Sequence, residues 1–395
     1  MKRLLKSTLP LGLVLTAASM NAHAQSSVTL YGIVDSGVAY VHNALSGTQN
    51  QATLVKFNSG GLSGSRWGLK GQEDLGGGLA AIFQIENGFN VGTGALGQGS
   101  REFGRKAVVG LASQTYGTVT LGRQYDPLVD LIQPLTEDGY FGGAFASPGD
   151  LDNYDNSLRV SNSIKYVSPV WSGLQVEALY ALGGAAGATG NGQTYSFGLG
   201  YNRGPLGLAA GYFYADGGRT TATSTTGVTS RTWTSTSDSL FNTVINQGFA
   251  SAKSVQIARA GGQYVFGQFT AGVAYSHTVY ARDSLSVFSG DAKFNNGSAF
   301  LNYRFTPAFQ IGAGYNYTSL TGPTSGHYHQ FNLGADYNLS RRTDVYLVGG
   351  YQKAYGNTVS TSGAVVDATA SVGSYGVNSG ASSQALVVAG IRHRF

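Results

Sequence analysis

The feature that most constrains this chain is an alternation of apolar and polar residues with a period of two, which recurs from Val28 to the C-terminus. Near its start, Val28, Leu30 and Val34 fall on one face of an extended chain, whereas Tyr31 and Asp35 fall on the other. Alternation of this kind predicts β-strands whose two faces meet different surroundings. Helices are disfavoured because 59 of the 395 residues are glycine, which weakens a helix.

Composition narrows the fold class further. Only 11% of the residues are charged, whereas soluble domains carry about 25%. No apolar run approaches the roughly 20 residues of a transmembrane helix, and the 24 tyrosines and 19 phenylalanines argue against bulk disorder. The absence of cysteine excludes disulfides, thiolate metal sites and cysteine nucleophiles. Together these properties predict an all-β fold, a transmembrane β-barrel with one lipid-facing and one water-facing side.

Residues 1–24 are predicted to be a cleaved signal peptide. They contain three cations within the first six residues, an apolar stretch over 9–18 and an Ala-His-Ala cleavage site at 22–24. A membrane anchor is the alternative, but the apolar stretch is too short to span a bilayer. Cleavage would lower the net charge from +5 to +2, because the segment holds three of the 25 cations and none of the 20 acids. A nucleic-acid partner is therefore not expected.

Sixteen candidate strands predict a single antiparallel barrel domain over residues 25–395. They lie at 27–41, 62–72, 78–90, 102–112, 117–124, 158–167, 173–183, 193–202, 205–216, 254–266, 268–281, 292–305, 308–320, 327–339, 343–354 and 384–395. Long connections are predicted at 42–61, 91–101, 125–157, 217–253 and 355–383. Short turns on one rim and long loops on the other are typical of outer-membrane barrels. A soluble β-sandwich would not account for the low charge.

Four blocks of sequence carry a resemblance to a known family. They are SVTLYG at 27–32, SRWGLKGQEDLGGG at 65–78, TVTLGRQ at 118–124 and GIRHRF at 390–395. With them the chain resembles the general diffusion porins of the Gram-negative outer membrane, of the β-proteobacterial type. The resemblance implies a sixteen-stranded homotrimer in outer-membrane lipid, with the third loop folded into each pore. It also implies a passive channel for ions and small hydrophilic solutes.

The last strand has a second interpretation besides closing the barrel. Phe395, His393 and Ile391 share one face of the alternation, whereas Arg394 and Arg392 share the other. A terminal aromatic residue on such a strand resembles the signal that the barrel-assembly machinery reads. Both roles can coexist, and Phe395 is therefore predicted to be an assembly signal.

A sixteen-stranded barrel has a lumen wide enough for water, so something must narrow it. The longest early connection, 125–157, is the candidate because it carries seven acids. Asp130, Glu137 and Asp138 are the acids most expected to face the channel. For each of them, a solvated loop charge or a salt bridge from loop to wall is the alternative.

Opposite an acidic loop, the wall is expected to supply cations. By resemblance to the family's pore-lining positions, Arg66, Arg105 and Arg159 form this basic cluster. The alternation also points Arg66 away from the face of Trp67. Lys106 could replace Arg105 if no bulge is present, and Arg123 is a weaker member of the cluster.

The expected selectivity is weak. A unit charge about 10 Å away contributes roughly 0.4 kcal/mol in water, and physiological salt cuts this to about a third. Several arginines would then favour anions by only a few-fold. The alternative functions are an outer-membrane barrel hydrolase, or a receptor or adhesin acting through the connection 217–253.

No catalytic, cofactor or metal site is predicted. The Gly-x-Gly-x-x-Gly pattern at 92–97 lacks a preceding buried strand and a following helix, so it is interpreted as a loop tip. His327 and His329 share one strand face, but a metal site needs more ligands, and exposed rim histidines are favoured. Aromatic residues near strand ends are expected at the bilayer interfaces, namely Tyr201, Tyr303, Phe305, Tyr337 and Tyr346.

Overall fold

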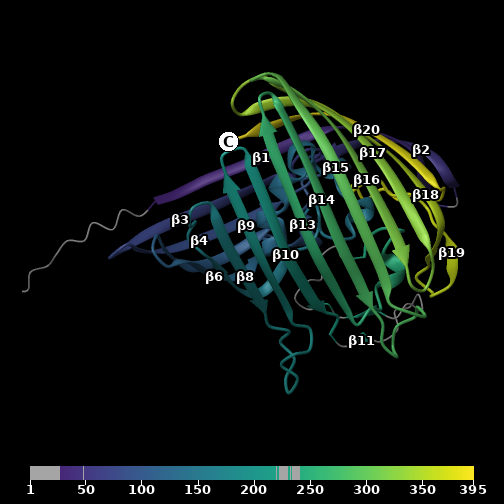
Figure 1. The fold of residues 1–395 in the computed structure, drawn as a ribbon, viewed down its shortest axis with the longest axis horizontal. Coiled ribbons are helices and arrows are strands. Elements are labelled where there is room, and N and C mark those ends of the chain that lie inside the picture. The colour runs from purple at the N-terminus through teal and green to yellow at the C-terminus, as the bar shows by residue number, and fades with distance from the viewer. Residues whose placement is uncertain (1–26, 48, 219, 222–229, 232, 234–240) are drawn as a thin grey trace, which may run out of the picture.

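The structure is a computed structural model that describes residues 27–47, 49–218, 220–221, 230–231, 233 and 241–395. The chain forms a tall antiparallel barrel (Figure 1). The predicted signal peptide and part of the connection 217–253 lie outside the described residues, so the signal peptide stays a prediction. Among the residues described, no helix is both long and apolar enough to cross a bilayer.

The secondary structure is dominated by strands. They are β1 (Ser27–Ser46), β2 (Gln49–Ser59), β3 (Arg66–Gly76), β4 (Leu79–Gly88), β5 (Lys106–Ser113), β6 (Gly117–Gln124), β7 (Val160–Val167), β8 (Leu174–Ala181), β9 (Thr194–Arg203), β10 (Leu206–Asp216), β11 (Thr220–Thr221), β12 (Ser230–Arg231), β13 (Ser254–Phe266), β14 (Phe269–Ala281), β15 (Ala292–Thr306), β16 (Phe309–Thr321), β17 (Gly326–Asn338), β18 (Thr343–Val359), β19 (Val365–Asp367) and β20 (Ser383–Arg394). The helical turns are α1 (Gly97–Ser100), α2 (Pro127–Leu131), η1 (Gln133–Leu135), α3 (Asp138–Phe141), η2 (Gly143–Phe145), η3 (Pro148–Asp150) and η4 (Gln247–Phe249).

The barrel closes between its first and last strands. β20 pairs with β1 on one side and with β18 on the other, and both pairings are antiparallel. β2 and β3 pair with different parts of β1, so they share one position in the circuit. Within the described chain, β19 pairs only with β18, and β11 and β12 form a separate sheet. The circuit therefore has sixteen positions, which confirms the predicted sixteen-stranded barrel.

The predicted strands agree closely with the structure, with one clear exception. Every predicted range overlaps a strand, and β6 and β13 have the predicted bounds. The predicted loop at 42–61 is wrong, because β2 occupies most of it. Val55 and Phe57 are apolar residues on the exposed face of this strand, 65% and 57% accessible, and Asn58, which follows Phe57, is buried.

The predicted strand 62–72 begins only at Arg66 because Asp35 reorganises the residues before it. The Asp35 carboxylate accepts hydrogen bonds from the backbone N–H groups of Gly61, Leu62 and Ser63 at 3.1, 2.9 and 2.8 Å. These three N–H groups therefore bind the buried Asp35 carboxylate within a turn and do not take part in hydrogen bonds between strands. A single buried carboxylate thus divides one barrel position into β2 and β3.

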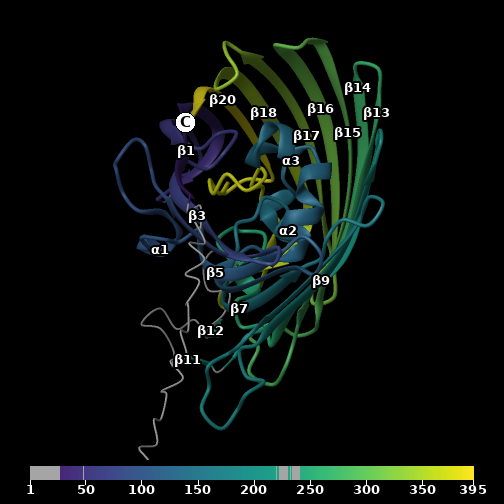
Figure 2. The same cartoon turned by 90° about the vertical axis from the view of Figure 1, so that its left-hand side faces the viewer.

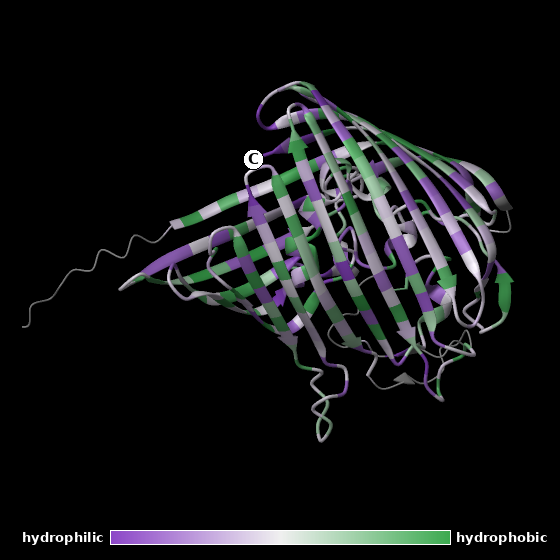
Figure 3. Cartoon of the chain, in the orientation of Figure 1, coloured by the Kyte–Doolittle hydropathy of each residue, from purple (hydrophilic) through white to green (hydrophobic). Residues whose placement is uncertain are grey.

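The two faces of the sheet differ as the alternation predicts. One face, here called the outer face, bears exposed apolar residues such as Leu333 and Val273, and the other, the inner face, bears buried polar ones such as Gln330. Hydropathy alternates along the strands at the front of the barrel in Figure 3. Phe305 and Tyr337 are exposed on the outer face as expected for interfacial aromatics. Tyr346 was wrongly assigned to an interface.

Tyr346 points to the inner face because Asp35 holds it there. Its hydroxyl donates to Asp35 Oδ1 at 2.6 Å, and the side chain is buried.

The barrel has two different rims. The long connections, including the one between β6 and β7, gather at the loop rim, whereas short turns and the C-terminus gather at the turn rim. Long loops mark the extracellular side of outer-membrane barrels.

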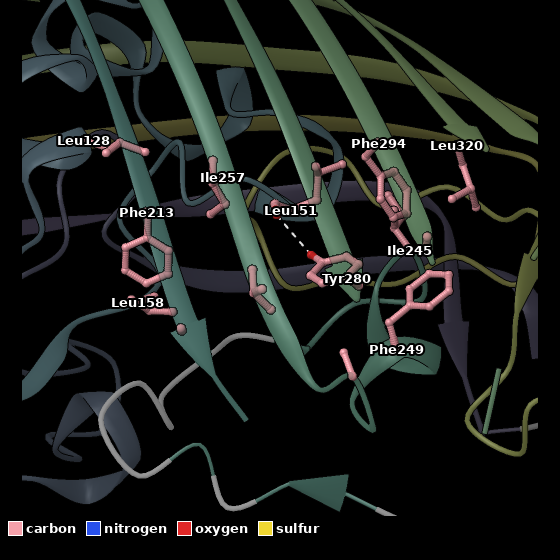
Figure 4. Close-up of a cluster of buried hydrophobic side chains, with 14 of the residues drawn as sticks. Leu128, Leu151, Leu158, Phe213, Ile245, Phe249, Ile257, Tyr280, Phe294 and Leu320 are labelled. Atoms are coloured by element: carbon pink, nitrogen blue, oxygen red, sulfur yellow. Dashed lines mark hydrogen bonds between the residues drawn. The ribbon is translucent and has the colours of Figure 1, made fainter. Parts of the chain in front are cut away.

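The largest apolar cluster forms between the inner face and the connection from β6 to β7. Leu128 and Leu151 of that connection meet Phe213 of β10, Ile257 of β13 and Tyr280 of β14 (Figure 4). The Tyr280 hydroxyl donates to the Leu151 carbonyl at 3.0 Å. This packing holds the connection against the wall, and α2 and α3 lie within the ring of strands in Figure 2.

Candidate functional site

The connection between β6 and β7 is a compact chain of short helical turns. Asp126 caps α2, since its carboxylate accepts from the Leu128 N–H at 2.8 Å, and Pro127 occupies the first helical position. Both residues favour a helix start. Gly142 has φ 73° after α3, so a residue that tolerates a left-handed conformation ends that turn.

Hydrogen bonds tie this connection to the inner face. Gln330 of β17 donates through Nε2 to the Ala144 and Ala146 carbonyls at 3.2 and 2.8 Å. Tyr154 and Ser298 of β15 share a hydroxyl–hydroxyl bond of 2.9 Å. The fixed wall therefore positions the connection through both its backbone and its side chains.

Aromatic and glycine contacts fix the same connection by shape. The Arg259 guanidinium carbon lies 3.6 Å from the ring centre of Tyr154. Phe141 is fully buried over Gly334, where a β-carbon would come within 2.4 Å of its ring. Only a glycine at position 334 therefore leaves room for the Phe141 ring.

A cavity of about 610 Å³ lies between the connection and the wall. Arg66, Arg105 and Arg159 line one part of it, and the acidic residues that line it are Asp130, Asp138 and Asp155. The structure therefore brings the three arginines and two of the three predicted acids to one space. Asp155 belongs to the predicted connection but was not singled out among its acids.

Tyr125 joins two of these arginines. The guanidinium carbons of Arg105 and Arg159 lie 5.9 and 5.4 Å from the centre of its ring. Burial alone would raise the pKa of Tyr125, but Arg105 and Arg159 outweigh burial and hold that pKa below its usual value. Arg105 also forms an ion pair with Glu86, with Nε 2.7 Å from Oε1.

The weaker cation candidates lie outside this cavity. Arg105 and not Lys106 lines it, because the strand β5 begins only at Lys106 and the preceding residue leaves the regular alternation. Arg123 is not one of the lining residues; it donates through Nε to the Gly104 carbonyl at 2.7 Å and through Nη1 to Ser161 at 2.6 Å. Arg123 thus secures the backbone beside Arg105.

The three predicted acids have three different surroundings. Asp130 lines the cavity but forms an ion pair with Lys165, which also lies 2.9 Å from Glu177. This contact is the salt bridge from loop to wall that was the alternative interpretation. Asp138 lines the cavity and accepts from Gln133 Nε2 at 3.0 Å.

Glu137 does not line the cavity. It is buried and turned toward β16, where a β-carbon at Gly314 would lie 1.7 Å from its Oε2. Within the described residues, its Oε1 has no hydrogen-bond partner. Burial, followed by repulsion from Asp138, raises the pKa of Glu137 well above its usual value.

Burial also raises the pKa of several other acids of the connection. Burial and then the neighbouring Asp155 raise the pKa of Asp138 well above the ordinary range. Burial likewise raises the pKa of Asp155, and burial and Asp155 together raise the pKa of Asp150 to about 7. The carboxyl groups of the connection therefore carry less negative charge near neutrality than their number suggests.

A second connection reaches the same cavity, and sequence reasoning missed its role. The segment 371–375, in the connection between β18 and β20, contributes Ser374 and Tyr375 to the lining. The Ser374 N–H donates to the Gly143 carbonyl at 2.9 Å, and its hydroxyl donates to Asp155. The two connections therefore contact each other beside the arginines.

Three inner-face glutamines hold this second segment. Gln352 donates to the Ser371 carbonyl and accepts from its N–H, both at 2.8 Å. Gln330 and Gln384 accept from the next backbone N–H groups at 3.0 and 2.9 Å. Glutamine at corresponding inner positions of three neighbouring strands is the sequence signal that could have revealed this contact.

Comparison with known proteins identifies the family. A family model described as Gram-negative porin matches residues 12–357. The chain belongs to the Gram-negative porin family. An outer membrane porin protein of Bordetella pertussis is 31% identical over 381 residues, covering 89% of this chain and 95% of the relative. The major outer membrane protein P.IB of Neisseria gonorrhoeae is 27% identical, over 90% and 97% of the two chains.

Solved structures agree with this assignment. An anion-selective porin from Comamonas acidovorans matches the porin described here with a TM-score of 0.69 at 25% identity, over 94% of this chain and 100% of the other. The predicted porin resemblance and the predicted location in the outer membrane are therefore confirmed. In the described part of this porin, no group of three or more metal-ligating side chains occurs.

Proposed function

We propose that this porin forms a water-filled channel for the passive diffusion of ions and small hydrophilic solutes, narrowed between the arginine wall and the connection 125–157. In this proposal the connection is the inward-folded third loop. The single observation that carries the proposal is the shared cavity, in which Arg66, Arg105 and Arg159 meet the acidic side of the connection.

The charge around this cavity favours anions. Glu86 offsets Arg105, and Lys165 offsets Asp130. Burial raises the pKa of both Asp138 and Asp155, which weakens the ability of these carboxyl groups to offset the remaining positive charge. The Comamonas acidovorans relative is itself described as anion-selective. We therefore infer a weak preference for anions.

The proposed assembly is a homotrimer, supported by the uneven height of the barrel wall. β5, β6, β7 and β8 have eight residues each, whereas β13 to β18 have 13 to 17. A membrane-spanning strand needs about 9–11 residues, so the short side suits contact with neighbouring subunits more than contact with lipid. Val109 and Leu121 keep this side apolar. The long side would face outer-membrane lipid.

Current measurements across a planar bilayer test the proposal. Purified porin in a potassium chloride gradient should give a reversal potential of the sign that marks chloride as the more permeant ion. Vesicles that hold the porin should swell with small neutral sugars and not with large ones. A clear preference for cations, unchanged in Arg66→Ala, would contradict the assigned role of the arginines.

The alternatives predict other results. A barrel hydrolase would cleave ester or peptide substrates without conducting ions, and a receptor would depend on its surface loops. If the open-channel conductance is unchanged after removal of residues 222–229, transport does not depend on this part of the connection 217–253. No cofactor is needed for diffusion through a cavity of this kind.

A further inference from the structure

Glu137 is a buried carboxyl group that takes no part in lining the cavity. It directly precedes α3, whose residues Asp138 and Gly139 do line the cavity. The Glu137 side chain turns away from them and lies over β16, where a β-carbon on Gly314 would overlap its Oε2. Gly312, two residues earlier on the same face, also lacks a side chain. The carboxyl group therefore occupies space on the wall that two glycines leave free.

One polar side chain shares this space with Glu137. Asn302 of β15 pairs with Gly312 in the strand register. A β-carbon on Gly312 would overlap Asn302 Oδ1 and would lie 3.0 Å from Glu137 Oε1, so both oxygens lie over one glycine. Glu137 and Asn302 are only 6% and 4% exposed. Within the described residues, Glu137 Oε1 and both amide atoms of Asn302 have no hydrogen-bond partner.

At the level of this pair, the described wall offers no cation. The inner-face residues of β15, β16 and β17 at this level are uncharged, namely Phe300, Asn302, Gly312, Gly314, Asn332 and Gly334. The next charged residues on this face are Arg304 and Asp336, each two positions nearer the turn rim, where they line a smaller cavity. On the connection itself, Asp138 adds a charge of the same sign, and the Tyr140 hydroxyl donates to Gln263 at 2.7 Å.

A carboxyl group in these surroundings is stabilised by a proton. A buried carboxylate without a cation loses its hydration and gains little in exchange. A neutral carboxylic acid carries one O–H donor, and Asn302 Oδ1 is the unpartnered acceptor over the same glycine. Burial and Asp138 both raise the pKa of Glu137, which agrees with the neutral form. The pair therefore favours the protonated acid.

We propose that Glu137 is a positioning residue, which holds α3 against the wall as a neutral acid bonded to Asn302 and releases it on ionisation. This inference rests on the proposed function, because α3 can affect transport only if the connection 125–157 narrows the channel. Asp138 and Gly139 follow Glu137 directly, so a displaced Glu137 moves two cavity-lining residues. Ionisation should therefore cause fluctuations of the open channel while the barrel stays intact.

Single-channel currents at several pH values test this role. Wild-type porin in a planar bilayer should flicker more often as the pH rises, because below its pKa the ionised fraction of an acid grows about ten-fold per pH unit. Glu137→Gln keeps a neutral side chain with an N–H donor, so its flicker frequency should stay at the low-pH value of the wild type. Glu73→Gln is the matched control, because Glu73 of β3 is an exposed acid, and this variant should keep the wild-type pH profile.

Two outcomes would overturn the proposal. One is an equal rise of the flicker frequency in wild type and Glu137→Gln. The other is a flat wild-type profile, which is expected if Glu137 is ionised throughout and accepts from Asn302 Nδ2.

A second variant decides the case if Glu137→Gln does not assemble. Asn302→Leu removes the acceptor of the neutral acid, so this channel should flicker already at low pH. A quiet Asn302→Leu channel at low pH would contradict the pairing. Failure of the proposed function gives a different result, because selectivity would then be unchanged in Arg66→Gln whatever the pH profile of Glu137→Gln.

Discussion

Replacing Arg66 with glutamine should make this porin less selective for anions by a predictable amount. Arg66 begins β3 and lines the cavity with Arg105 and Arg159. A cavity of about 610 Å³ has the volume of a sphere of roughly 5 Å radius, so an ion at its centre lies about 7 Å from the guanidinium charge. Glutamine keeps a polar side chain and removes only the charge.

The magnitude follows from Coulomb's law. At about 7 Å in water one charge contributes about 0.6 kcal/mol, and screening at physiological salt leaves about 0.25 kcal/mol. Anions and cations respond with opposite sign, so the difference between them is about 0.5 kcal/mol, or roughly two-fold in the anion-to-cation permeability ratio. A low-dielectric wall strengthens the field, which makes two-fold the lower bound.

Reversal potentials in a potassium chloride gradient measure this ratio directly. Arg341→Gln is the matched control, because Arg341 lies exposed in the turn between β17 and β18 and is not one of the cavity-lining residues. The Arg66→Gln ratio should fall at least two-fold, and the fall should shrink in concentrated salt. An unchanged ratio, or an equal fall in the Arg341→Gln control, would refute the assignment of the arginines to the conducting path.

Three further predictions concern pH, packing and assembly. Raising the pH from about 5 to about 8 should reduce anion preference, because burial raises the pKa of Asp138 and Asp155, and both then gain negative charge as they lose protons. Because the pKa of these acids is higher in the folded than in the unfolded chain, the folded state also loses stability as the pH rises. Thermal unfolding at several pH values measures this loss. Gly334→Ala should cost about 1–3 kcal/mol by overpacking the ring above it, whereas Gly297→Ala, in open space, should lower the melting temperature less. Deleting Phe395 should lower the yield of assembled trimer in cells, because its backbone exchanges two hydrogen bonds with β1 at 3.1 and 3.0 Å; normal yield would count against an assembly signal.

The wall of the barrel could be predicted well from the sequence. In each strand, residues on the outer face contact lipid and residues on the inner face contact water or other protein, so side chains alternate wherever a strand occurs. β6 and β13 were predicted with their observed bounds for this reason. The pore cations needed the porin resemblance as well, because alternation alone could not choose between Arg105 and Lys106.

The lumen was predicted less well because its contacts are remote in sequence. Tyr346 follows an interfacial pattern, yet its partner Asp35 lies 311 residues earlier. Glu137 precedes Asp138 directly, but a turn of α3 sends the two carboxyl groups to different surroundings. The insertion of Ser374 depends on glutamines from three strands. No local pattern encodes these pairings.

The buried acids of the lumen show why the position of a charge matters more than the number of charges. A connection that packs against a wall needs buried contacts, and a buried carboxyl group is stabilised by a proton, a cation or hydrogen bonds. Burial raises the pKa of Glu137 and so favours its neutral form, and Asp130 forms an ion pair with Lys165. The first response lowers the negative charge of the connection, and the second offsets an acid that lines the cavity. An acid-rich loop can therefore lie beside arginines in a channel that still favours anions.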